Sequence, residues 1–447
     1  MNAALARWLY LAAQQRRGEP VAAVLRELEA SQAWPLERLQ ALQWERQRVL
    51  ARHAFETVPF YRERWSRAGF VPGDLRGPDD WARLPALEKR EVQEQGAALL
   101  STGARHAGVR ATTSGSSGMP VAVLRGHRSW AHAHANVFRG WRWHGLDIGD
   151  PHAYFWGLAL DASGRRQAGL RDWFFNRRRF SAFETEPARA RAFHDRLRRR
   201  PARFAFGYPS AVMNFTALAA AQGLDLRALG WRAIVTTAEV LWPHQRERLA
   251  GAYGCAVVDS YGCAEAGVAG FECEAGGMHV PVESVVVDLE PAGEGLFEIL
   301  LTDLHNRVQP LIRYRIGDLV GPAPGACACG RALPLLGTLQ GRAGDTITLP
   351  DGRVVSGLLP YYIFRHHAKS GVVREYQFVE FPGGRLELRV AAGAGWNDAV
   401  AAGIRDEVSR GLGLPVEVRV VPRFERRGRG KHRDWVRAAD LGEGPGA

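Results

Sequence analysis

The sequence of 447 residues has few cysteines and no long apolar run. Five cysteines are too few, and odd in number, for a disulfide framework. No stretch reaches the roughly 18 apolar residues that a membrane span needs, and the N-terminus lacks the basic head and apolar core of a signal peptide. These absences predict a cytoplasmic protein with no membrane partner.

Lysine is also scarce, because Lys89, Lys369 and Lys431 are the only three in the chain. Lysine and arginine together number 59 against 47 acidic residues, a formal net charge of +12. A basic protein can bind nucleic acid, but here acidic and basic residues are mixed through most of the chain. Local arginine excesses at 177–179, at 198–200 and in the C-terminal tail are typical of solvated helix faces, or would dock a phosphate-bearing substrate. We expect no nucleic-acid partner.

The chain is longer than the about 250 to 300 residues at which a single core stops growing, so we expect two or more domains. Apolar residues at helical spacing predict helices over residues 1 to 65, and another beginning near Pro85. From 145 to 260, short apolar strands alternate with helical segments, which indicates crossover units and a largely parallel sheet. From 376 to 421 the pattern is strand, strand, helix, strand.

These patterns predict an α/β protein with two domains. The larger, residues 1–340, has several layers with mostly parallel sheets, and the smaller, residues 341–447, is a mobile α+β domain. In open parallel sheets the ligand lies at the C-terminal ends of the strands. Residues 236–239 and 259–262 follow or end such strands, so they are candidate site segments.

A stretch of hydroxyl residues and glycines at 112–120 is the most prominent motif. Its N–H and O–H donors can converge on one anion, as in a loop that holds a polyphosphate. Such clusters are also typical of solvated linkers, and Met119-Pro120 excludes a Walker loop, which needs Lys-Ser or Lys-Thr there. The candidate phosphate-binding residues are Thr113, Ser114, Gly115, Ser116, Ser117 and Gly118.

Two later segments carry groups that a magnesium nucleotide needs. Tyr261 offers an aromatic face to a base, and Glu265 offers a carboxylate to Mg²⁺. Asp318, which we expect at a turn, can accept hydrogen bonds from both ribose hydroxyls. Each has a structural alternative: Tyr261 as a core residue, Glu265 as a helix N-cap and Asp318 as a turn former.

Five motifs in this order resemble the adenylate-forming superfamily of acyl-CoA synthetases, peptide-synthetase adenylation domains and luciferases, over nearly the whole chain. They are Thr-Ser-Gly-Ser-Ser-Gly-Met-Pro at 113–120, Tyr-Gly-Cys-Ala-Glu at 261–265, Tyr-Arg-Ile-Gly-Asp at 314–318, Gly-Arg-Ala-Gly-Asp at 341–345, and Gly430-Lys431.

Within that superfamily the chain is similar to the branch of phenylacetate-CoA ligases and CapK-like capsule-biosynthesis proteins. The segments that carry this closer resemblance are HAFETVPFYR at 53–62, LPALEKR at 84–90, GYPS at 207–210, TTAE at 236–239 and CACGR at 327–331.

The resemblance implies a reaction in which a carboxylate attacks the α-phosphate of ATP and pyrophosphate leaves. A nucleophile, most often the thiol of CoA, then captures the acyl-adenylate. Residues 114–118 would hold the β- and γ-phosphates, and Glu265 would hold Mg²⁺. Tyr261 would pack on the adenine beside Glu239, and Asp318 would hold the ribose. The other residues assigned to the nucleotide are Ser260, Gly262 and Arg342.

Lys431 would bridge the acyl carboxylate and the α-phosphate, a task suited to a compact charge on a long stem. Its alternative is an exposed lysine in a basic tail. The resemblance also implies that the small domain rotates between the half-reactions about a hinge at residues 341–345, which would withdraw Lys431 when the acceptor enters.

Three positions depart from the family pattern. Ala264 stands where relatives usually carry Thr or Ser, Gly344 where the hinge residue is commonly Asp or Lys, and Val121 where a lysine usually follows the proline of the loop. These departures leave adenylation chemically feasible but put the second half-reaction in question, so the acceptor need not be CoA.

Cys273, His279, Cys327 and Cys329 together offer three thiols and an imidazole, the ligand set of a closed structural Zn²⁺ site. The Cys-X-Cys spacing is tighter than the usual two-residue gap, and about 50 residues separate the pairs. The alternative is four unrelated residues.

We therefore predict an ATP-dependent, Mg²⁺-requiring ligase that activates an aromatic or other organic carboxylic acid and transfers it to CoA, with a structural Zn²⁺ as a further candidate and a homodimer as a candidate assembly. An amide ligase with an amine or saccharide acceptor is the nearest alternative. A non-catalytic nucleic-acid-binding protein on this fold is the alternative from another class. Trp156, Tyr208 and residues 258 to 269 are candidates for the acid pocket, although aromatic residues there are also typical of a core.

Overall fold

The structure is a computed structural model. It describes residues 1–104, 108–112, 121–156, 162–182, 186–293, 295–342, 346–349, 354–356, 372–422, 424, 435–441 and 443. Among these residues, none of the helices combines the length and the apolarity that a bilayer crossing requires.

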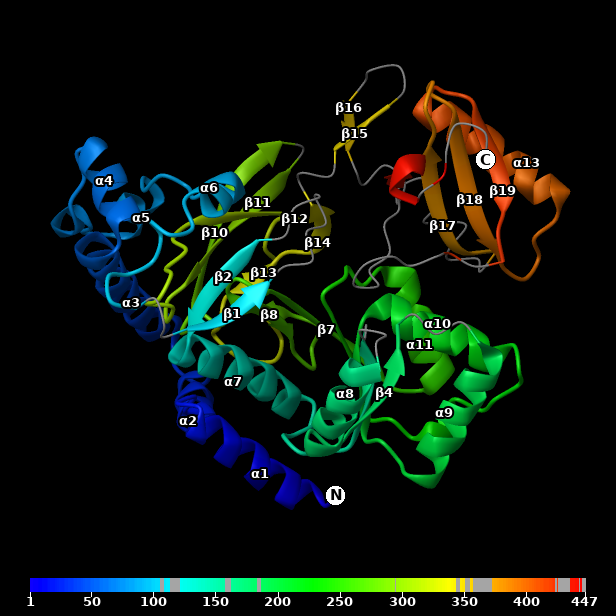
Figure 1. The fold of residues 1–447 in the computed structure, drawn as a ribbon, viewed down its shortest axis with the longest axis horizontal. Helices are drawn as coiled ribbons and strands as arrows, with labels where there is room; N and C mark the ends of the chain where they lie inside the picture. Colours follow the sequence, from blue (N-terminus) through cyan, green and yellow to red (C-terminus); the bar gives the residue numbers. More distant parts are fainter. Residues whose placement is uncertain are drawn as a thin grey trace.

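Helices form the N-terminal part of the chain, as the apolar spacing predicts (Figure 1). The side chain of Asn2 caps the first helix, and Pro59 begins the fourth, where its missing N–H costs nothing. The helix expected near Pro85 begins only at Lys89, because Leu87 forms a β-bridge with Tyr314. These elements are α1 (Ala3–Arg16), α2 (Val21–Ser31), α3 (Leu36–Thr57), α4 (Pro59–Arg67), η1 (Pro72–Asp74), α5 (Pro78–Ala82) and α6 (Lys89–Glu94).

An eight-stranded sheet lies at the centre of the larger part, in the order β13-β9-β8-β7-β6-β5-β3-β4. The five strands from β4 to β7 are parallel, and β8, β9 and β13 continue the sheet in antiparallel pairs. The strands are β3 (His152–Trp156), β4 (Arg177–Ser181), β5 (Phe204–Gly207), β6 (Ala233–Thr237), β7 (Ala256–Cys263), β8 (Gly267–Glu272), β9 (Met278–His279) and β13 (Leu335–Leu336).

Helices cover both faces of this sheet (Figure 1). Phe155, Ala205 and Ile234 face one side and pack in a core with α9, α10 and α11, whereas Phe204 and Val235 face the other side and pack against α7 and α2. Alternate residues of a strand point to opposite faces, which explains why these strands read as continuous apolar runs. The helices are α7 (His127–Trp143), α8 (Ala162–Phe174), α9 (Pro187–Arg199), α10 (Pro209–Ala220), η2 (Arg227–Leu229) and α11 (Pro243–Tyr253).

A second, antiparallel sheet in the order β10-β11-β12-β14 and a two-stranded hairpin lie beside the N-terminal helices. Tyr314 of β12 and Val286 of β10 share a core with Trp65 and Trp81 of these helices. The strands are β1 (Gly108–Thr112) and β2 (Ala122–Gly126) in the hairpin, and β10 (Val285–Gly293), β11 (Leu296–Asp303), β12 (Tyr314–Val320) and β14 (Leu339–Arg342) in the sheet.

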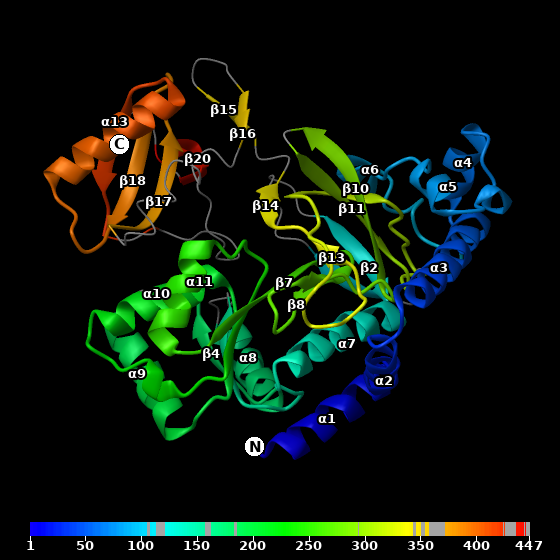
Figure 2. The ribbon, with the colours of Figure 1, turned by 180° about the vertical axis from the view of Figure 1, so that it is seen from behind.

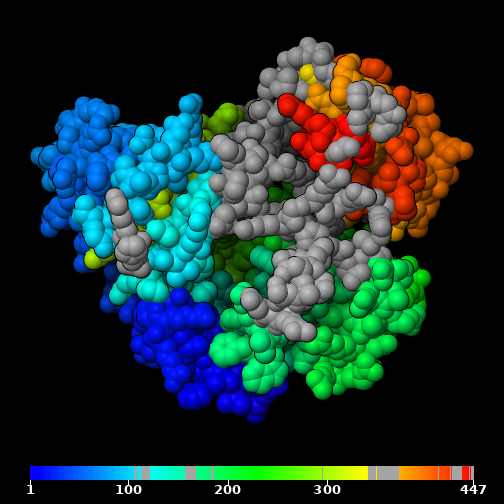
Figure 3. Space-filling view, in the orientation of Figure 1, coloured from blue at the N-terminus to red at the C-terminus, as the bar shows by residue number. Residues whose placement is uncertain are grey.

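The C-terminal part forms a separate unit with its own sheet, in the order β19-β18-β17-β20, and its own core around Phe378, Leu388 and Val408. Figures 2 and 3 show it, in orange and red, set apart from the N-terminal helices. The sequence pattern predicts β17, β18, α13 and β19, and it does not predict the other elements of this part. They are β17 (Val373–Glu380), β18 (Leu386–Ala392), α13 (Asp398–Leu412), β19 (Val416–Val420), β20 (Trp435–Arg437) and η3 (Ala438–Leu441), with β15 (Thr346–Thr348) and β16 (Val354–Ser356) pairing before them.

The predicted α/β class, with large sheets and a separate C-terminal α+β unit, is confirmed. The boundary between residues 340 and 341 stays a prediction. Gly341 and Arg342 belong to β14, which pairs with β12 of the larger part.

Candidate nucleotide and carboxylate site

The two candidate site segments lie on neighbouring strands of the parallel sheet. Thr237, the last residue of β6, pairs with Ser260 of β7, and Glu239 follows β6 by two residues. Ser260 also donates from its hydroxyl to the carbonyl of Thr236, at 3.0 Å. The parallel register therefore brings Glu239 and the start of the Tyr261 motif to one edge of the sheet, as the alternation of strands and helices predicts.

Tyr261 and Asp318 meet between the two sheets. The hydroxyl of Tyr261, on β7, donates to Asp318 Oδ2, on β12, at 2.8 Å. The expectation that Asp318 lies at a turn is wrong: it lies within β12, where its Cα partner is Arg342 of β14. The preceding Gly317 has φ +81°, a left-handed conformation that glycine adopts without strain.

Gly262 accounts for the close approach of two strands next to Tyr261. A Cβ atom on Gly262 would lie 2.4 Å from the carbonyl oxygen of Gly267, on β8. A larger residue would therefore push β7 and β8 apart and shift the Tyr261 ring.

Glu265 lies in the turn between β7 and β8 and is buried, with 6 % of its surface exposed. Tyr314 donates to its Oε1 at 3.4 Å, a long hydrogen bond from the neighbouring sheet. No helix follows, so the alternative of a helix N-cap is wrong. Its carboxylate oxygens are of the ligand type that Mg²⁺ prefers.

Glu239 has one occupied and one open carboxylate oxygen. Its Oε2 accepts a hydrogen bond from the backbone N–H of Ser210 at 3.1 Å, while Oε1 is buried without a hydrogen-bond partner among the described residues. The preceding Ala238 has φ +69°, a conformation that costs a non-glycine residue energy and tends to occur at functional sites. The open oxygen can accept one N–H from a ligand.

The sequence interpretation did not single out Asp259 and Arg125, which support these segments. Asp259 accepts from the Thr236 hydroxyl at 2.9 Å, and burial raises its pKa to about 7. Arg125 forms a buried ion pair with Asp303 at 3.1 Å and donates to the carbonyl of Ala264 at 3.4 Å. Asp259 stood within a candidate segment, whereas nothing in the sequence near Arg125 marks a contact 139 residues away.

Several predicted residues lie outside the described part of the chain. The hairpin β1–β2 is described up to the pair Thr112 and Ala122, which flank the predicted phosphate loop on both sides. For Arg342 the backbone alone is described. The residues outside are Thr113, Ser114, Gly115, Ser116, Ser117, Gly118 and Lys431.

Aromatic rings collect at the C-terminal ends of β3 and β5, beside the same edge of the sheet. Trp156 and Tyr208 have ring centroids 4.3 Å apart, and Trp156 also stacks on Tyr154 at 5.5 Å. Tyr208 is buried and belongs to the core under α10, while Trp156 stays half-buried. Of the two candidates for the acid pocket, Trp156 is the one with surface left to contact a ligand.

The four predicted zinc ligands come together away from these strand ends. Their ligand atoms all lie within 4.8 Å of one another, and Cys273 is buried. The Sγ atoms of Cys273 and Cys327 are 3.5 Å apart, too far for a disulfide, and His279 Nε2 is 3.1 Å from the Sγ of Cys329.

The donor set and its geometry fit a tetrahedral Zn²⁺ ion. Zn–S bonds of about 2.3 Å and Zn–N bonds of about 2.0 Å place neighbouring ligand atoms roughly 3.5 Å apart, close to the two separations above. His279 Nδ1 donates to the carbonyl of Leu333 at 2.8 Å, which leaves the lone pair of Nε2 for a metal. Burial raises the pKa of the Cys273 thiol to about 12, so a cation is needed to hold this thiol as a thiolate.

No family model matches the chain. Sequence similarity to curated proteins nevertheless extends over most of it. The chain is 25% identical over 350 residues to the phenylacetate-coenzyme A ligase of Thermus thermophilus, covering 70% of this chain and 73% of that one. It is 25% identical over 341 residues to the phenylacetate-coenzyme A ligase of Pseudomonas putida, covering 72% and 74%.

Solved structures of acyl-CoA ligases share the fold. 2-Hydroxyisobutyryl-CoA ligase in the postadenylation state with 2-HIB-AMP matches with a TM-score of 0.74 at 21% identity, over 92% of each chain. The structure of the same enzyme in an open conformation with 2-HIB-AMP and CoA matches with a TM-score of 0.60 at 22% identity, over 90% of this chain and 92% of that one. The anthranilate CoA ligase in complex with anthranoyl-AMP matches with a TM-score of 0.50 at 17% identity, over 72% of this chain and 65% of that one.

These similarities confirm the resemblance that the ordered motifs indicated. The chain is similar in sequence to phenylacetate-coenzyme A ligases and shares the fold of the solved acyl-CoA ligase structures.

Proposed function

We propose that this protein is an ATP-dependent ligase that converts an organic carboxylic acid to an acyl-adenylate and transfers the acyl group to CoA. The observation that carries this proposal is the contact between Tyr261 and Asp318, 2.8 Å apart, beside Glu239 and Glu265. An aromatic ring, an open carboxylate oxygen and two further carboxylates are the groups that a base, a ribose and Mg²⁺ require.

The nucleotide would be oriented by three of these side chains. The ring of Tyr261 packs on the adenine, and the open Oε1 of Glu239 accepts an N–H from its edge. Asp318 accepts hydrogen bonds from the ribose hydroxyls. These bonds either replace the one from Tyr261 or use the other carboxylate oxygen, Oδ1. These contacts hold the α-phosphate in place for in-line attack by the acid. The rate gain comes from positioning the two reactants.

Charge is the second problem, because the acid and ATP are both anions. When bound, Mg²⁺ supplies positive charge that offsets the phosphate oxygens, and Glu265 is the residue that would hold it. Lys431 would bridge the carboxylate and the α-phosphate, and residues 114–118 would accept the β- and γ-phosphates through N–H and O–H groups.

For the acid we propose an aromatic or other planar organic acid. Support comes from the half-buried Trp156, which lies at the C-terminal end of β3 and stacks on Tyr154. A flat ring or chain of the substrate would bury the remaining face of Trp156.

We also propose that Cys273, His279, Cys327 and Cys329 hold a structural Zn²⁺. Such an ion would join β8 and β9 to the segment that leads into β13, near the edge of the eight-stranded sheet. The site is closed by four protein ligands, so its role would be structural rather than catalytic.

The direct test is ATP–pyrophosphate exchange with a panel of carboxylic acids, followed by addition of CoA or amines and identification of the product. Exchange that depends on the acid supports the ligase, and a thioester product supports CoA as acceptor. An amide would instead favour the amine acceptor. Absence of exchange with every acid, together with salt-sensitive binding of nucleic acid, would overturn the proposal in favour of a non-catalytic protein.

A further inference from the structure

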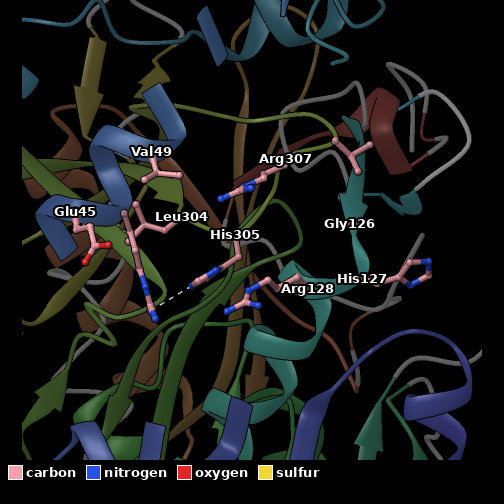
Figure 4. A pocket seen from close by; sticks show the side chains of 10 residues that line it. Glu45, Val49, Gly126, His127, Arg128, Leu304, His305 and Arg307 are labelled. Carbon is pink, nitrogen blue, oxygen red and sulfur yellow. Dashed lines mark hydrogen bonds between the residues drawn. The ribbon is translucent and has the colours of Figure 1, made fainter. Parts of the chain in front are cut away.

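A second basic cavity lies apart from the residues of the nucleotide site. It has a volume of about 530 Å³ and is bounded by α3, the start of α7 and the segment 304–308 (Figure 4). Its size is in the range of about 300 to 1,000 Å³ that small-molecule sites occupy. The lining residues are Glu45, Arg46, Val49, Gly126, His127, Arg128, Leu304, His305, Arg307 and Val308.

Positive charge dominates this cavity, because Arg46, Arg128 and Arg307 line it against one carboxylate, that of Glu45. Figure 4 shows Arg128 and Arg307 on two sides of His305. None of the three arginines forms an ion pair with a carboxylate among the described residues. The exposed guanidinium groups of Arg128 and Arg307 are therefore available to an anion, and that of Arg46 in part, since its Nη1 donates to a backbone carbonyl.

Two further carboxylates close to the cavity are engaged elsewhere. Asp303 pairs with the buried Arg125 at 3.1 Å, and Glu283 pairs with the buried Arg139 at 2.7 Å. Arg46 donates instead to the backbone carbonyl of Glu283, and it lies 3.4 Å from His305 Nε2. Both acids are thus already paired with an arginine outside the cavity.

The backbone around the cavity is fixed, so the site is preformed. The carbonyl of Arg307 accepts hydrogen bonds from His53 at 2.8 Å and from Ser101 at 2.6 Å, which leaves its exposed side chain to project outward. The ring of His305 is stacked on His132, with centroids 3.4 Å apart and an interplanar angle of 8°.

The start of α7 adds a separate reason for an anion. This helix of 17 residues has Gly126 as its N-cap, no side-chain cap and no acid in its first turn. Arg128 instead places a positive charge at the positive end of the helix dipole, which is unfavourable until an anion offsets it. The arginine cluster and the uncapped helix thus favour the same kind of ligand.

We propose that this cavity binds a small phosphate monoester. A tetrahedral dianion can bridge several guanidinium groups with paired N–H donors and accept from the helix terminus, which a carboxylate of lower charge does less well. The volume leaves room for an organic group beside the phosphate.

The site is distinct from the proposed nucleotide site. The two share no residue, and β2 runs from Ala122, two positions after Pro120 in the chain, to Gly126 at the cavity. Five residues of strand span about 13 Å between their first and last Cα atoms. Binding in this cavity can therefore be measured whether or not the adenylation proposal holds.

The test is calorimetric titration of the full chain with inorganic phosphate and with ribose 5-phosphate. We expect the Arg128→Gln/Arg307→Gln variant to bind ribose 5-phosphate about tenfold more weakly or worse. The control, Arg48→Gln/Arg199→Gln, removes two exposed arginines outside the cavity and should bind like the original protein. Crystals soaked in tungstate, a tetrahedral dianion, should show density between Arg46, Arg128 and Arg307.

Three results of the phosphate titrations would overturn the proposal: no binding, equal weakening in both variants, or unchanged binding in the cavity variant. If CoA displaces ribose 5-phosphate from the original protein and CoA binding is weakened in the cavity variant, the natural ligand is a phosphate group of CoA. That result would still support the site. Duplex DNA that binds more tightly than either phosphate, and loses that affinity in the cavity variant, would replace the small-molecule class by nucleic acid and sink the proposal.

Discussion

The hydroxyl of Tyr261 and the carboxylate of Asp318 are 2.8 Å apart and come from different sheets, β7 and β12. The contact fixes Asp318 on the strand that also pairs with Arg342. In the free protein Tyr261 thus occupies a carboxylate that, in our proposal, binds the ribose. Ribose binding and the Tyr261 contact are coupled through one side chain.

Replacing Asp318 with Ala should therefore raise the KM for ATP about tenfold or more, because hydrogen bonds to a charged group contribute about 1.5 to 3 kcal/mol. Steady-state exchange kinetics with ATP, 2′-deoxy-ATP and 3′-deoxy-ATP measure this directly. The original protein should discriminate against both deoxy analogues, and Asp318→Ala should not. Discrimination that survives in Asp318→Ala would contradict the assignment of the ribose to this residue.

Tyr261→Phe is a milder change in the same contact. It keeps the ring that would pack on the adenine and removes only the hydroxyl, so we expect a severalfold change in the KM for ATP, on the order of 1 kcal/mol. Tyr261→Ala should be far worse, since the stacking face is lost as well. Equal effects of the two variants, measured by the same kinetics, would argue that the hydroxyl and not the ring is important.

Lys431→Ala should reduce carboxylate-dependent ATP–pyrophosphate exchange by at least about a hundredfold, because the variant lacks the cation that we propose bridges the reacting oxygens. Lys89→Ala is the matched control, since Lys89 lies on α6 and outside the proposed site. If chemically prepared acyl-adenylate is supplied, Lys431→Ala should still transfer the acyl group to CoA. Exchange that is unaffected by Lys431→Ala would remove the assignment.

The sequence predicted the parallel part of the fold well because each strand carries its own pattern. The runs that include Phe155, Phe204 and Ile234 are apolar on both faces, and buried strands with helices on both sides require this. β20 is only three residues long and joins β17 after a long connection, so its pairing has no local pattern. The pairing of strands that are distant in the sequence depends on tertiary packing, which a short stretch of sequence does not reveal.

The site was predicted as a set of residues and not as a set of contacts. The sequence motifs identified Tyr261, Asp318 and Glu265 as site residues. The hydrogen bond between Tyr261 and Asp318 depends on how two sheets pack, which the motifs do not specify. Asp318 was expected at a turn, yet it lies in an irregular strand in which Gly317 has a positive φ. The metal cluster was predicted from ligand types alone, since about 50 residues separate its halves.

Zinc is the prediction that depends least on the reaction. The purified protein should contain about one zinc ion per chain by mass spectrometry, and Cys327→Ser should lower that content. Because such a site exists only in the folded chain, chelation should lower the Tm by several degrees. Cys255→Ser is the control, because Cys255 is a free cysteine outside the cluster. If Cys327→Ser and Cys255→Ser had the same zinc content and the same Tm, the zinc site would be ruled out.

Asp259 should make stability depend on pH. Its pKa in the folded protein is raised from an ordinary value of 3.8 to about 7, mainly by burial, although Thr236 and Arg246 act in the opposite direction. The folded state therefore holds a proton that the unfolded chain releases above about pH 4. The stabilisation is fully present below that pH and is lost as the pH rises through about 7.

Asp259→Asn should remove this dependence, because the amide stays neutral and its oxygen can still accept from the Thr236 hydroxyl. Denaturant unfolding between pH 4 and 8 measures the effect: the free energy of unfolding should fall less steeply with pH in the variant, by about 1.4 kcal/mol for each unit of the pKa difference that is realised. Glu272 accepts a hydrogen bond from the backbone N–H of Asp259 and pairs with Arg246, so Glu272→Gln tests the share of this pair. Parallel pH profiles for the original protein and Asp259→Asn would show that Asp259 is already ionised when folded.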